Sequence, residues 1–211
     1  MTEAASTAQQ LSGDSETFAL HLPTASHAAG AQLHAHRGLP TGSPRAIILL
    51  AHGYAEHGGR YADVAGRFTA SGYALYAVDH WGHGRSQGPQ GYVPTFSIYL
   101  DGMQTLLARV TSDFPDTPLF LIGHSMGGLI AARFLARHQQ HFTAAALSGP
   151  ALQAGKGPML LTKIASRLLS RLTPHLGVMA LDSDDISRDP ALVARYRADP
   201  LVYRGRMSAR L

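Results

Sequence analysis

Residues 119–135 have the sequence LFLIGHSMGGLIAARFL. An apolar run of strand length meets a serine flanked by glycines, and an apolar-periodic helix begins directly after it. This order of strand, turn and helix is the context in which a G-x-S-x-G sequence forms a nucleophile elbow. Gly123 and Gly127 lack the Cβ atoms that would collide with the neighbouring strand or helix in so tight a turn. We therefore expect Ser125 to be presented above the sheet as a nucleophile, with the Met126 amide as a donor to an oxyanion.

The five-residue motif alone is weakly specific, because an ordinary glycine-rich turn between a strand and a helix can contain it. A second loop favours the nucleophile elbow over that alternative. It follows the apolar run of residues 45–51 and begins with His52, Gly53 and Tyr54. The Tyr54 amide is the expected second oxyanion donor. We expect His52, Gly53 and His124 to shape the loop or to contact the substrate.

The first 150 residues alternate between short apolar runs and helical patterns. Near-continuous apolar runs are typical of strands that are buried on both faces of a parallel sheet. The sequence therefore predicts an α/β fold, a mostly parallel sheet flanked by helices and joined by right-handed crossovers. The expected strands are residues 18–22, 32–36, 45–51, 73–78, the run that begins at 119, and 142–147; the expected helices are residues 61–68, 96–114 and the one after Ser125.

Three segments are expected along the chain. Residues 1–16 are rich in Ser, Thr, Ala and Gln and predict a flexible N-terminal arm. Residues 17–150 form the α/β core. Residues 151–211 lack a strongly apolar strand pattern and predict a helical cap laid over the ends of the strands.

Two helices are expected in the cap. Residues 161–172 place leucines and isoleucine on one helical face and Lys, Arg and Ser on the other. Asp189 and Pro190 are a typical N-cap and first position for a short helix that runs to Arg197. A basic amphipathic helix can rest on a membrane surface, but its apolar face more commonly packs on the core of its own protein.

The composition indicates a globular protein of 211 residues, of which 45% are hydrophobic and 15% charged. No apolar run approaches the roughly 18 residues of a membrane span. The N-terminus lacks the basic-then-apolar order of a signal peptide. We therefore expect a cytoplasmic location, with peripheral membrane association through the cap as a further option. The absence of cysteine excludes disulfides and thiolate chemistry.

The net charge of +4 is unevenly distributed. Residues 1–150 carry 8 basic and 9 acidic side chains, a balance of −1, whereas residues 151–211 carry 10 and 5, a balance of +5. A basic segment can meet nucleic acid or an anionic membrane, or it can simply be solvated. No nucleic-acid-binding motif accompanies the charge, so no nucleic-acid partner is expected.

Three loops together resemble those of monoacylglycerol lipases and related lysophospholipases, which are α/β-hydrolases of the serine aminopeptidase type. These loops are HGYAEHGGRY at residues 52–61, DHWGHGRS at 79–86 and GHSMGG at 123–128. Residues 187–201 are similar to the far end of that family's cap, and the resemblance covers roughly residues 30–205. It implies an α/β-hydrolase fold, esterase activity on acylglycerols and a lid that helps to dock on membranes. It also implies Ser125 as nucleophile and the amides of Tyr54 and Met126 as the oxyanion hole.

A triad base and acid are not found in the sequence. In α/β-hydrolases the serine is followed along the chain by Asp or Glu and then by His. The family's acid and histidine follow strands that come after the cap, so we expect a C-terminally truncated chain that lacks the final strands of the fold. The histidines after Ser125 are not expected to act as the base: His138, His141 and His175. The strand at residues 142–147 would then be an uncovered sheet edge.

Other polar residues near the loops are expected to be structural. We expect the loop histidines to shape the pocket through hydrogen bonds: His52, His57, His80 and His83. Asp79 is expected to cap its own turn. His124 adjoins the nucleophile, but successive residues at an elbow point apart, so a base role is not expected for it.

The sequence thus predicts a serine hydrolase that cleaves fatty-acyl esters, such as a monoacylglycerol or a lysophospholipid, through an acyl-enzyme on Ser125. The alternative is a truncated, non-catalytic fragment that binds acyl ligands or a partner. No cofactor is expected. No metal site is expected either, because the pairs His34/His36 and His80/His83 lack a convincing third ligand.

Overall fold

The chain is built around a six-stranded sheet, and a computed structural model describes its residues 15–152 and 168–211. The strand order is β1-β2-β4-β3-β5-β6. Strands β4, β3, β5 and β6 run parallel, whereas β1 pairs with β2 and β2 pairs with β4 in antiparallel fashion. The strands are β1 Ser15–His21, β2 Gln32–Gly38, β3 Ala46–Ala51, β4 Tyr73–Val78, β5 Leu119–His124 and β6 Ala144–Ser148. The predicted α/β fold with a mostly parallel sheet is confirmed.

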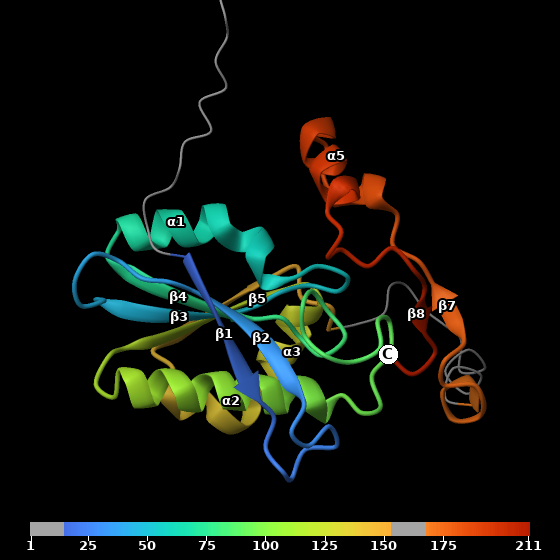
Figure 1. Cartoon of the computed structure of the whole chain (residues 1–211), viewed down its shortest axis with the longest axis horizontal. Coiled ribbons are helices and arrows are strands. Elements are labelled where there is room, and N and C mark those ends of the chain that lie inside the picture. The colour runs from blue at the N-terminus through green and yellow to red at the C-terminus, as the bar shows by residue number, and fades with distance from the viewer. Residues whose placement is uncertain (1–14, 153–167) are drawn as a thin grey trace, which may run out of the picture.

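Helices lie on both faces of this sheet (Figure 1). Helix α1 (Ala62–Ala70) covers one face, and helices α2 (Ser97–Asp113) and α3 (Met126–His138) cover the other. Two short 3-10 turns follow β3 and α3, namely η1 (Gly58–Tyr61) and η2 (Gln139–His141). All three helices that the sequence predicted in this part of the chain are present.

The central strand β3 shows why an unbroken apolar run was needed. All six of its residues are buried. Ile47 and Leu49 belong to the cluster that packs under α2 and α3, whereas Ile48 and Leu50 belong to a second cluster on the α1 side. Because successive side chains of a strand point to opposite faces, a strand covered on both sides has no polar position.

The N-terminal boundary differs slightly from the prediction. The predicted arm was residues 1–16, but β1 already begins at Ser15, and the carboxylate of Glu16 forms an ion pair with Arg37 on β2. Pairing with β2 therefore draws these two residues into the sheet. The rest of the predicted arm, residues 1–14, lies outside the described residues.

The segment from residue 168 onward contains more than the predicted helices. Helix α5 (Pro190–Ala198) begins where the sequence predicted, and the Asp189 side chain accepts a hydrogen bond from the Ala191 amide. A two-stranded antiparallel sheet, β7 (Gly177–Met179) and β8 (Met207–Ser208), was not predicted, because strands of 3 and 2 residues are too short to show periodicity. A 3-10 turn, η3 (Ser183–Ile186), lies between β7 and α5.

The other predicted cap helix, residues 161–172, is described only in part. Residues 161–167 lie outside the described residues, and residues 168–172 are helical.

This C-terminal segment rests on the loops that follow β3 and β4, as Figure 1 also shows. The Tyr203 amide donates to the Ala55 carbonyl over 2.9 Å, and the Ser208 amide donates to the Gly91 carbonyl over 2.9 Å. These loops leave the carboxyl ends of parallel strands, which is where ligands bind in open α/β sheets.

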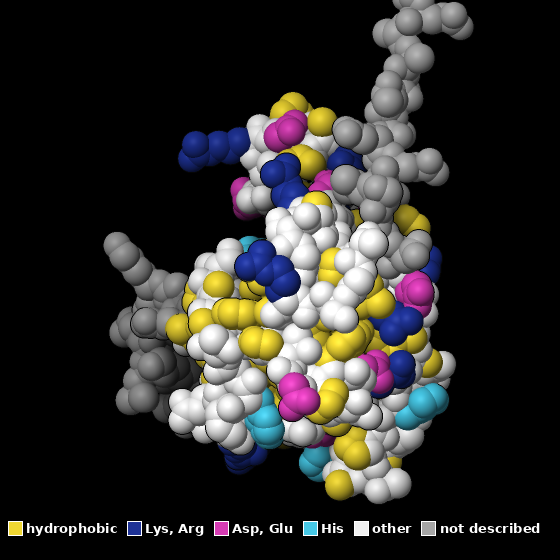
Figure 2. Space-filling model, turned by 90° about the vertical axis from the view of Figure 1, so that its left-hand side faces the viewer, with side chains coloured by type: hydrophobic (Ala, Val, Ile, Leu, Met, Phe, Trp, Pro, Cys, Tyr) yellow, Lys and Arg dark blue, Asp and Glu magenta, His cyan; other side chains and the backbone are white. Residues whose placement is uncertain are grey.

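The surface carries hydrophobic side chains in several places. On the face shown in Figure 2 they form a broken band across the middle, and Lys and Arg side chains stand between them singly.

Among the helices of the described residues, none combines the length and the apolar character that a membrane crossing would require.

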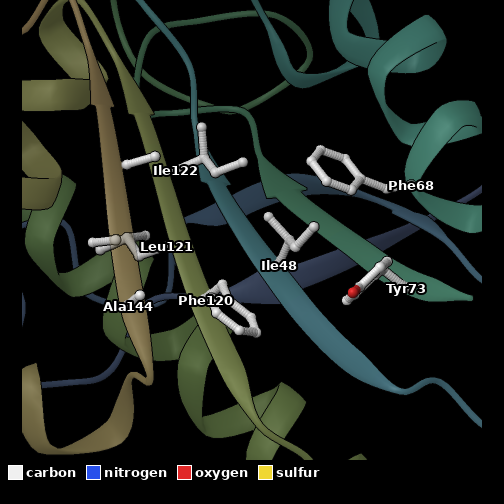
Figure 3. Close-up of a pocket in the computed structure, with 9 residues that line it drawn as sticks. Ile48, Phe68, Tyr73, Phe120, Leu121, Ile122 and Ala144 are labelled. Carbon is white, nitrogen blue, oxygen red and sulfur yellow. The ribbon is translucent and has the colours of Figure 1, made fainter. Parts of the chain in front are cut away.

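Strand β6 is the last strand of the sheet and is paired on one side with β5. All five of its residues are exposed. Beside it, on the α1 side, lies an apolar groove of about 320 Å³ (Figure 3). Its lining comes from β3, α1, β4, β5 and β6: Ile48, Phe68, Tyr73, Phe120, Leu121, Ile122 and Ala144–Ala146. Among the described residues, β6 is unpaired on the side away from β5, as expected for the strand at residues 142–147.

Candidate active site

Ser125 occupies a sharp turn between β5 and α3. Its φ and ψ angles are 51° and −116°, and it is one of two non-glycine residues with positive φ in the described residues. Such a conformation costs a side-chain-bearing residue about 1–3 kcal/mol and is concentrated at functional sites. The Ser125 side chain is partly exposed, whereas Met126 after it is buried. The turn thus holds the hydroxyl at the surface end of a buried strand.

Two glycines make this turn possible. A Cβ atom on Gly127 would lie 2.0 Å from the carbonyl oxygen of Ala51, and one on Gly123 would lie 2.5 Å from the carbonyl oxygen of Gly127. Both contacts are with backbone, which cannot move aside as a flexible side chain would. The need for glycine at both positions is confirmed, and the Gly127 contact shows that the first turn of α3 lies directly against the end of β3.

The backbone of the elbow is also joined to the edge of the sheet. The Ser125 amide donates to the Ser148 carbonyl over 2.9 Å, and the Ala151 amide donates to the Ser125 carbonyl over 3.0 Å. Ser148 is the last residue of β6. The strained turn is therefore held from both sides, by β3 through glycine contacts and by β6 through hydrogen bonds.

The two expected oxyanion donors lie on adjoining segments. A Cβ atom on Gly53 would be 3.3 Å from the His124 ring, and one on Gly127 would be 2.5 Å from the His52 carbonyl oxygen. The loop that carries Tyr54 therefore packs against the elbow that carries Met126. Within residues 15–152 and 168–211, neither of these two amides donates a hydrogen bond to a backbone carbonyl or a side chain. Both have the donor capacity that an oxyanion requires.

Glu56 organises the loop of residues 52–61, a role that the sequence analysis missed. Its Oε1 accepts from the Gly53 amide over 2.6 Å and from the Tyr61 hydroxyl over 2.7 Å. Arg60 lies 3.4 Å from its other oxygen. A carboxylate that gathers an amide, a hydroxyl and a guanidinium fixes the course of the loop. The signal was available, since a buried loop amide needs an acceptor and Glu56 is the carboxylate nearest in sequence.

Three of the four loop histidines use a ring nitrogen in a hydrogen bond, as the sequence predicted, whereas the His80 ring has none in the described residues. His52 is fully buried; its Nδ1 lies 2.8 Å from the Gly53 carbonyl and its Nε2 accepts from the His80 amide over 2.9 Å. His83 Nδ1 lies 2.9 Å from the Trp81 carbonyl, and His57 Nε2 lies 2.9 Å from a carboxylate oxygen of Asp199. For His52, both ring nitrogens are used inside the loop, so the geometry supports shaping of the loop and not substrate contact.

Burial also sets the protonation of these rings. It lowers the pKa of His52, lowers that of His83 to about 3, and lowers that of His80 well below its ordinary value. The neighbouring histidines add to this effect for His80 and His83, because like charges oppose protonation. The three rings are therefore neutral at neutral pH.

Asp79 caps its turn, as predicted. Its Oδ1 accepts from the Gly58 amide over 2.8 Å, its Oδ2 accepts from the Arg85 amide over 3.0 Å, and His36 Nε2 lies 3.0 Å from Oδ1. Burial by itself would raise the pKa of this carboxyl group. The His36 hydrogen bond and the nearby His52 outweigh burial and hold the pKa of Asp79 well below its ordinary value. Asp79 is thus an ionised carboxylate inside the protein.

The reason given for expecting no metal site is wrong for one of the two pairs. His34 and His36 do have a third potential ligand, because the structure places Asp79 beside them, with one ligand atom of each residue within 4.8 Å of the others. The sequence concealed this because Asp79 is 43 positions from His36.

The histidines after the elbow are engaged elsewhere. His138 stacks on Phe134 at 4.3 Å between ring centroids, and His175 stacks on Tyr92 at 4.0 Å. His124 is exposed, and its Nδ1 lies 3.2 Å from the Ser148 carbonyl. In the described part of the chain, no hydrogen bond joins a histidine side chain to Ser125.

A strained serine on a glycine-framed turn, at the carboxyl edge of a mostly parallel sheet, defines this protein as an α/β-hydrolase with a serine elbow. Solved structures agree. A monoacylglycerol lipase from Paleococcus ferrophilus matches with a TM-score of 0.68 at 30% identity, over 85% of this chain and 66% of that one. A monoglyceride lipase variant from Saccharomyces cerevisiae, in complex with a substrate analogue, gives 0.75 at 23% identity over 92% and 66%, which supports the fold.

The family follows from the sequence comparison. The family model described as serine aminopeptidase, S33, matches residues 42–211, and the chain belongs to this family. It is 43% identical over 170 residues to a monoacylglycerol lipase of Mycolicibacterium smegmatis, covering 81% of this chain and 61% of the relative. It is 34% identical over 184 residues to human monoglyceride lipase, covering 87% and 61%. The chain thus spans about three fifths of the length of these relatives, and the resemblance seen in the three loops is confirmed.

Proposed function

We propose that this site is that of a serine hydrolase which cleaves fatty-acyl esters of the monoacylglycerol or lysophospholipid type. The observation that carries the proposal is Ser125 itself, held at φ 51° on a turn whose glycines admit no Cβ atom. A serine at this position favours acyl transfer, because α/β-hydrolases that attack halides or epoxides use a carboxylate nucleophile.

The chemistry follows from the arrangement. The Ser125 hydroxyl oxygen attacks the ester carbonyl carbon, and the carbonyl oxygen becomes an oxyanion. The proton of the hydroxyl passes to water and from water to the oxygen of the alcohol that leaves. The amides of Tyr54 and Met126 donate to that oxyanion, and each such donor is worth about 2.7–4 kcal/mol in the transition state. Collapse expels the alcohol and leaves an acyl-enzyme, which water then hydrolyses.

The substrate class is supported by the relatives. Those with the longest matches are named monoacylglycerol or monoglyceride lipases. A Haemophilus influenzae protein named as a probable lysophospholipase L2 is 36% identical over 114 residues. Both names describe the cleavage of one acyl chain from a glycerol-based lipid.

Labelling with a fluorophosphonate probe tests the nucleophile. The wild-type chain and Ser71→Ala, which alters an exposed hydroxyl at the end of α1, should be labelled and should hydrolyse a p-nitrophenyl acyl ester. Ser125→Ala should do neither. Equal labelling of Ser125→Ala would place the reactive hydroxyl elsewhere and would contradict the proposal.

A second candidate function is binding of acyl ligands without turnover. The observation that favours it is that no histidine side chain of the described residues is hydrogen-bonded to Ser125, while His138 and His175 stack on other rings. Without a base and an acid, a serine hydrolase keeps a rate of about 10³–10⁴ over water. A chain that binds a fluorescent fatty acid, yet shows no labelling and no turnover above Ser125→Ala, would support this candidate.

Contact with lipid surfaces through the C-terminal segment is part of the proposal. Several large apolar side chains are exposed there: Leu168, Leu172, Leu176, Val178, Met179 and Leu181. Leu172 is 71% exposed. Such residues beside a basic balance of charge are typical of segments that lie in a membrane interface.

Flotation with anionic lipid vesicles tests this contact. The double variant Leu172→Ser and Leu176→Ser should float less than the wild type. Val64→Ser, which removes an exposed apolar side chain from α1, is the matched control and should float as the wild type does. Equal flotation of all three proteins would contradict the membrane contact and leave the ester chemistry untouched.

A further inference from the structure

Two histidines and an aspartate meet at a place that the proposed ester chemistry does not use. His34 and His36 project from the same face of β2, because they are two residues apart on a strand. Their rings are 4.8 Å apart in an edge-to-face arrangement. Strand β4 pairs with β2 in antiparallel fashion, with Ala35 opposite Val78, so the residue that follows β4, Asp79, arrives beside both rings. One nitrogen from each ring and a carboxylate oxygen all lie within 4.8 Å of one another.

One ring nitrogen of His34 has no other use in the described part of the chain. His34 Nε2 is buried and has no hydrogen-bond partner there. Buried polar side-chain atoms are normally hydrogen-bonded, so each exception calls for a reason. The electron pair of an unpartnered ring nitrogen can bind a cation, and one nitrogen of this ring lies within 4.8 Å of an Asp79 carboxylate oxygen.

The Asp79 carboxylate already accepts hydrogen bonds from groups outside the proposed ligand set, as metal-binding carboxylates usually do. The amides of Gly58 and Arg85 donate one hydrogen bond to each Asp79 oxygen, at 2.8 and 3.0 Å. A carboxylate has about four lone-pair sites, so these two amides leave about two for other partners. His36 uses one of them now, at 3.0 Å. Such hydrogen bonds from outside the ligand set fix the orientation of a ligand and raise metal affinity.

The donor set selects the kind of ion. Two imidazole nitrogens and one carboxylate oxygen suit zinc and its neighbours, whereas Mg²⁺ and Ca²⁺ prefer oxygen ligands alone. Zinc can be held by three protein ligands with water in the fourth tetrahedral position, as it is in catalytic zinc sites. Both histidines are partly exposed, so the site lies near the surface of the protein. The geometry points to a binding site for Zn²⁺ or a similar transition-metal dication formed by His34, His36 and Asp79.

The site would act on the loop of residues 52–61 without touching Ser125. Gly58 in that loop donates to Asp79, and a Cβ atom on Gly58 would lie 2.7 Å from the His36 ring. An ion that joins β2 to the residue after β4 therefore also fixes the base of the loop that carries Tyr54. We expect bound Zn²⁺ to raise the thermal stability of the folded chain, since a ligand that binds the native state alone stabilises it.

Calorimetric titration with Zn²⁺ tests the site on the whole chain after removal of metal with a chelator. Because the chain has 12 histidines, a control for scattered binding is needed. His21→Gln alters an exposed histidine on β1 and should bind one Zn²⁺ as the wild type does. His34→Gln and His36→Gln should each lose that tight equivalent and the accompanying rise in melting temperature.

His34→Gln is the decisive variant, because no hydrogen bond from the His34 ring to another described residue would be removed by the substitution. Circular dichroism should show it folded as the wild type is. The Co²⁺-loaded wild type should show the visible absorption of a nitrogen-ligated ion, and His34→Gln should not. Tight Zn²⁺ binding that survives in folded His34→Gln, a wild type that binds no Zn²⁺, or an equal stabilisation by Mg²⁺ would each overturn the assignment.

Discussion

Strands β3 and β6 have similar sequences and opposite surroundings. The first, AIILLA, is buried at all six positions, and the second, AAALS, is exposed at all five. Both are parallel neighbours of β5, one on each side. The difference lies in their neighbours: β3 has a strand on both sides and helices on both faces, whereas β6 is the last strand of the sheet. An apolar run therefore predicts an extended strand, but the number of neighbours decides whether it is buried.

The elbow joins these two regions. Ser125 is pressed against the end of β3 through Gly127 and is hydrogen-bonded to the end of β6 through Ser148. On its β3 side the elbow is therefore close-packed against backbone, and on its β6 side it is bound to an exposed edge strand. These two sides are the two walls of the elbow. The following variants compare the two walls.

The largest effect is expected from Gly127→Ala. The new Cβ atom would lie 2.0 Å from the Ala51 carbonyl oxygen, so β3 or α3 must move. Losses above about 4 kcal/mol are reserved for such backbone conflicts and similar core defects. We expect loss of fluorophosphonate labelling together with a large fall in melting temperature.

Gly149→Ala, just after β6, is the matched control. Gly149 has a φ of 51°, but a Cβ atom there would meet nothing within 4 Å. The substitution should cost only the left-handed backbone conformation, about 1–2 kcal/mol. If Gly127→Ala were no more harmful than Gly149→Ala, the close contact between α3 and β3 would be refuted.

A second comparison truncates one leucine in each strand. Leu49 on β3 is 0% exposed, and Leu147 on β6 is 38% exposed. Leu49→Ala should lower the free energy of unfolding by about 2–5 kcal/mol, because it leaves a cavity in a packed core. Leu147→Ala should change it by no more than about 0.5 kcal/mol, as is usual at a surface. Urea unfolding of both variants measures the difference, and equal losses would show that β6 is covered in solution.

The sequence predicted those features that depend on residues close together in the chain. The apolar runs gave all six strands of the main sheet, and the glycines on either side of Ser125 gave the elbow. Periodicity and turn chemistry act over a few residues, which is why they can be read without a structure. The Asp189 cap of α5 is of the same kind.

Features that depend on strand order were missed. Asp79 reaches His34 and His36 because β4 pairs with β2, while β3, which lies between them in sequence, pairs with β4 and β5. Strands β7 and β8 find each other across 27 intervening residues that separate Met179 from Met207. No local pattern specifies such partners, since the register comes from the assembled sheet.

The buried region should also respond to pH in a way that the exposed region does not. The pKa of His83 is lowered to about 3 by burial, so between this value and the ordinary value near 6.5 the unfolded chain binds a proton that the folded chain does not. Stability is therefore complete above about pH 6.5 and falls as the pH drops, by about 1.4 kcal/mol per pH unit for each such histidine. His52 and His80 shift in the same direction and add to the fall.

His83→Gln checks this assignment. Urea unfolding at pH 7 and pH 5 should show a smaller pH-dependent loss in this variant than in the wild type. His27→Gln, which removes an exposed histidine, should keep the wild-type loss. A pH response identical in all three proteins would show that His83 does not contribute to it.

The smallest effect on stability is expected at the edge itself, from Ala146→Lys on β6. The residue is exposed, so the free energy of unfolding should change by about 0.5 kcal/mol or less. Its effect should appear in self-association, because an unpaired strand edge beside an apolar groove is a template for pairing and a lysine on it opposes that pairing. Light scattering over a range of protein concentrations should show association of the wild type that Ala146→Lys reduces.

Since the Ser148 carbonyl on the same strand accepts a hydrogen bond from the Ser125 amide, labelling with the fluorophosphonate probe is the control for this variant. Unchanged labelling would show that the edge can be charged without loosening the elbow. Undiminished association of Ala146→Lys would contradict association through the β6 edge. The exposed leucines of the C-terminal segment would then be the next residues to alter.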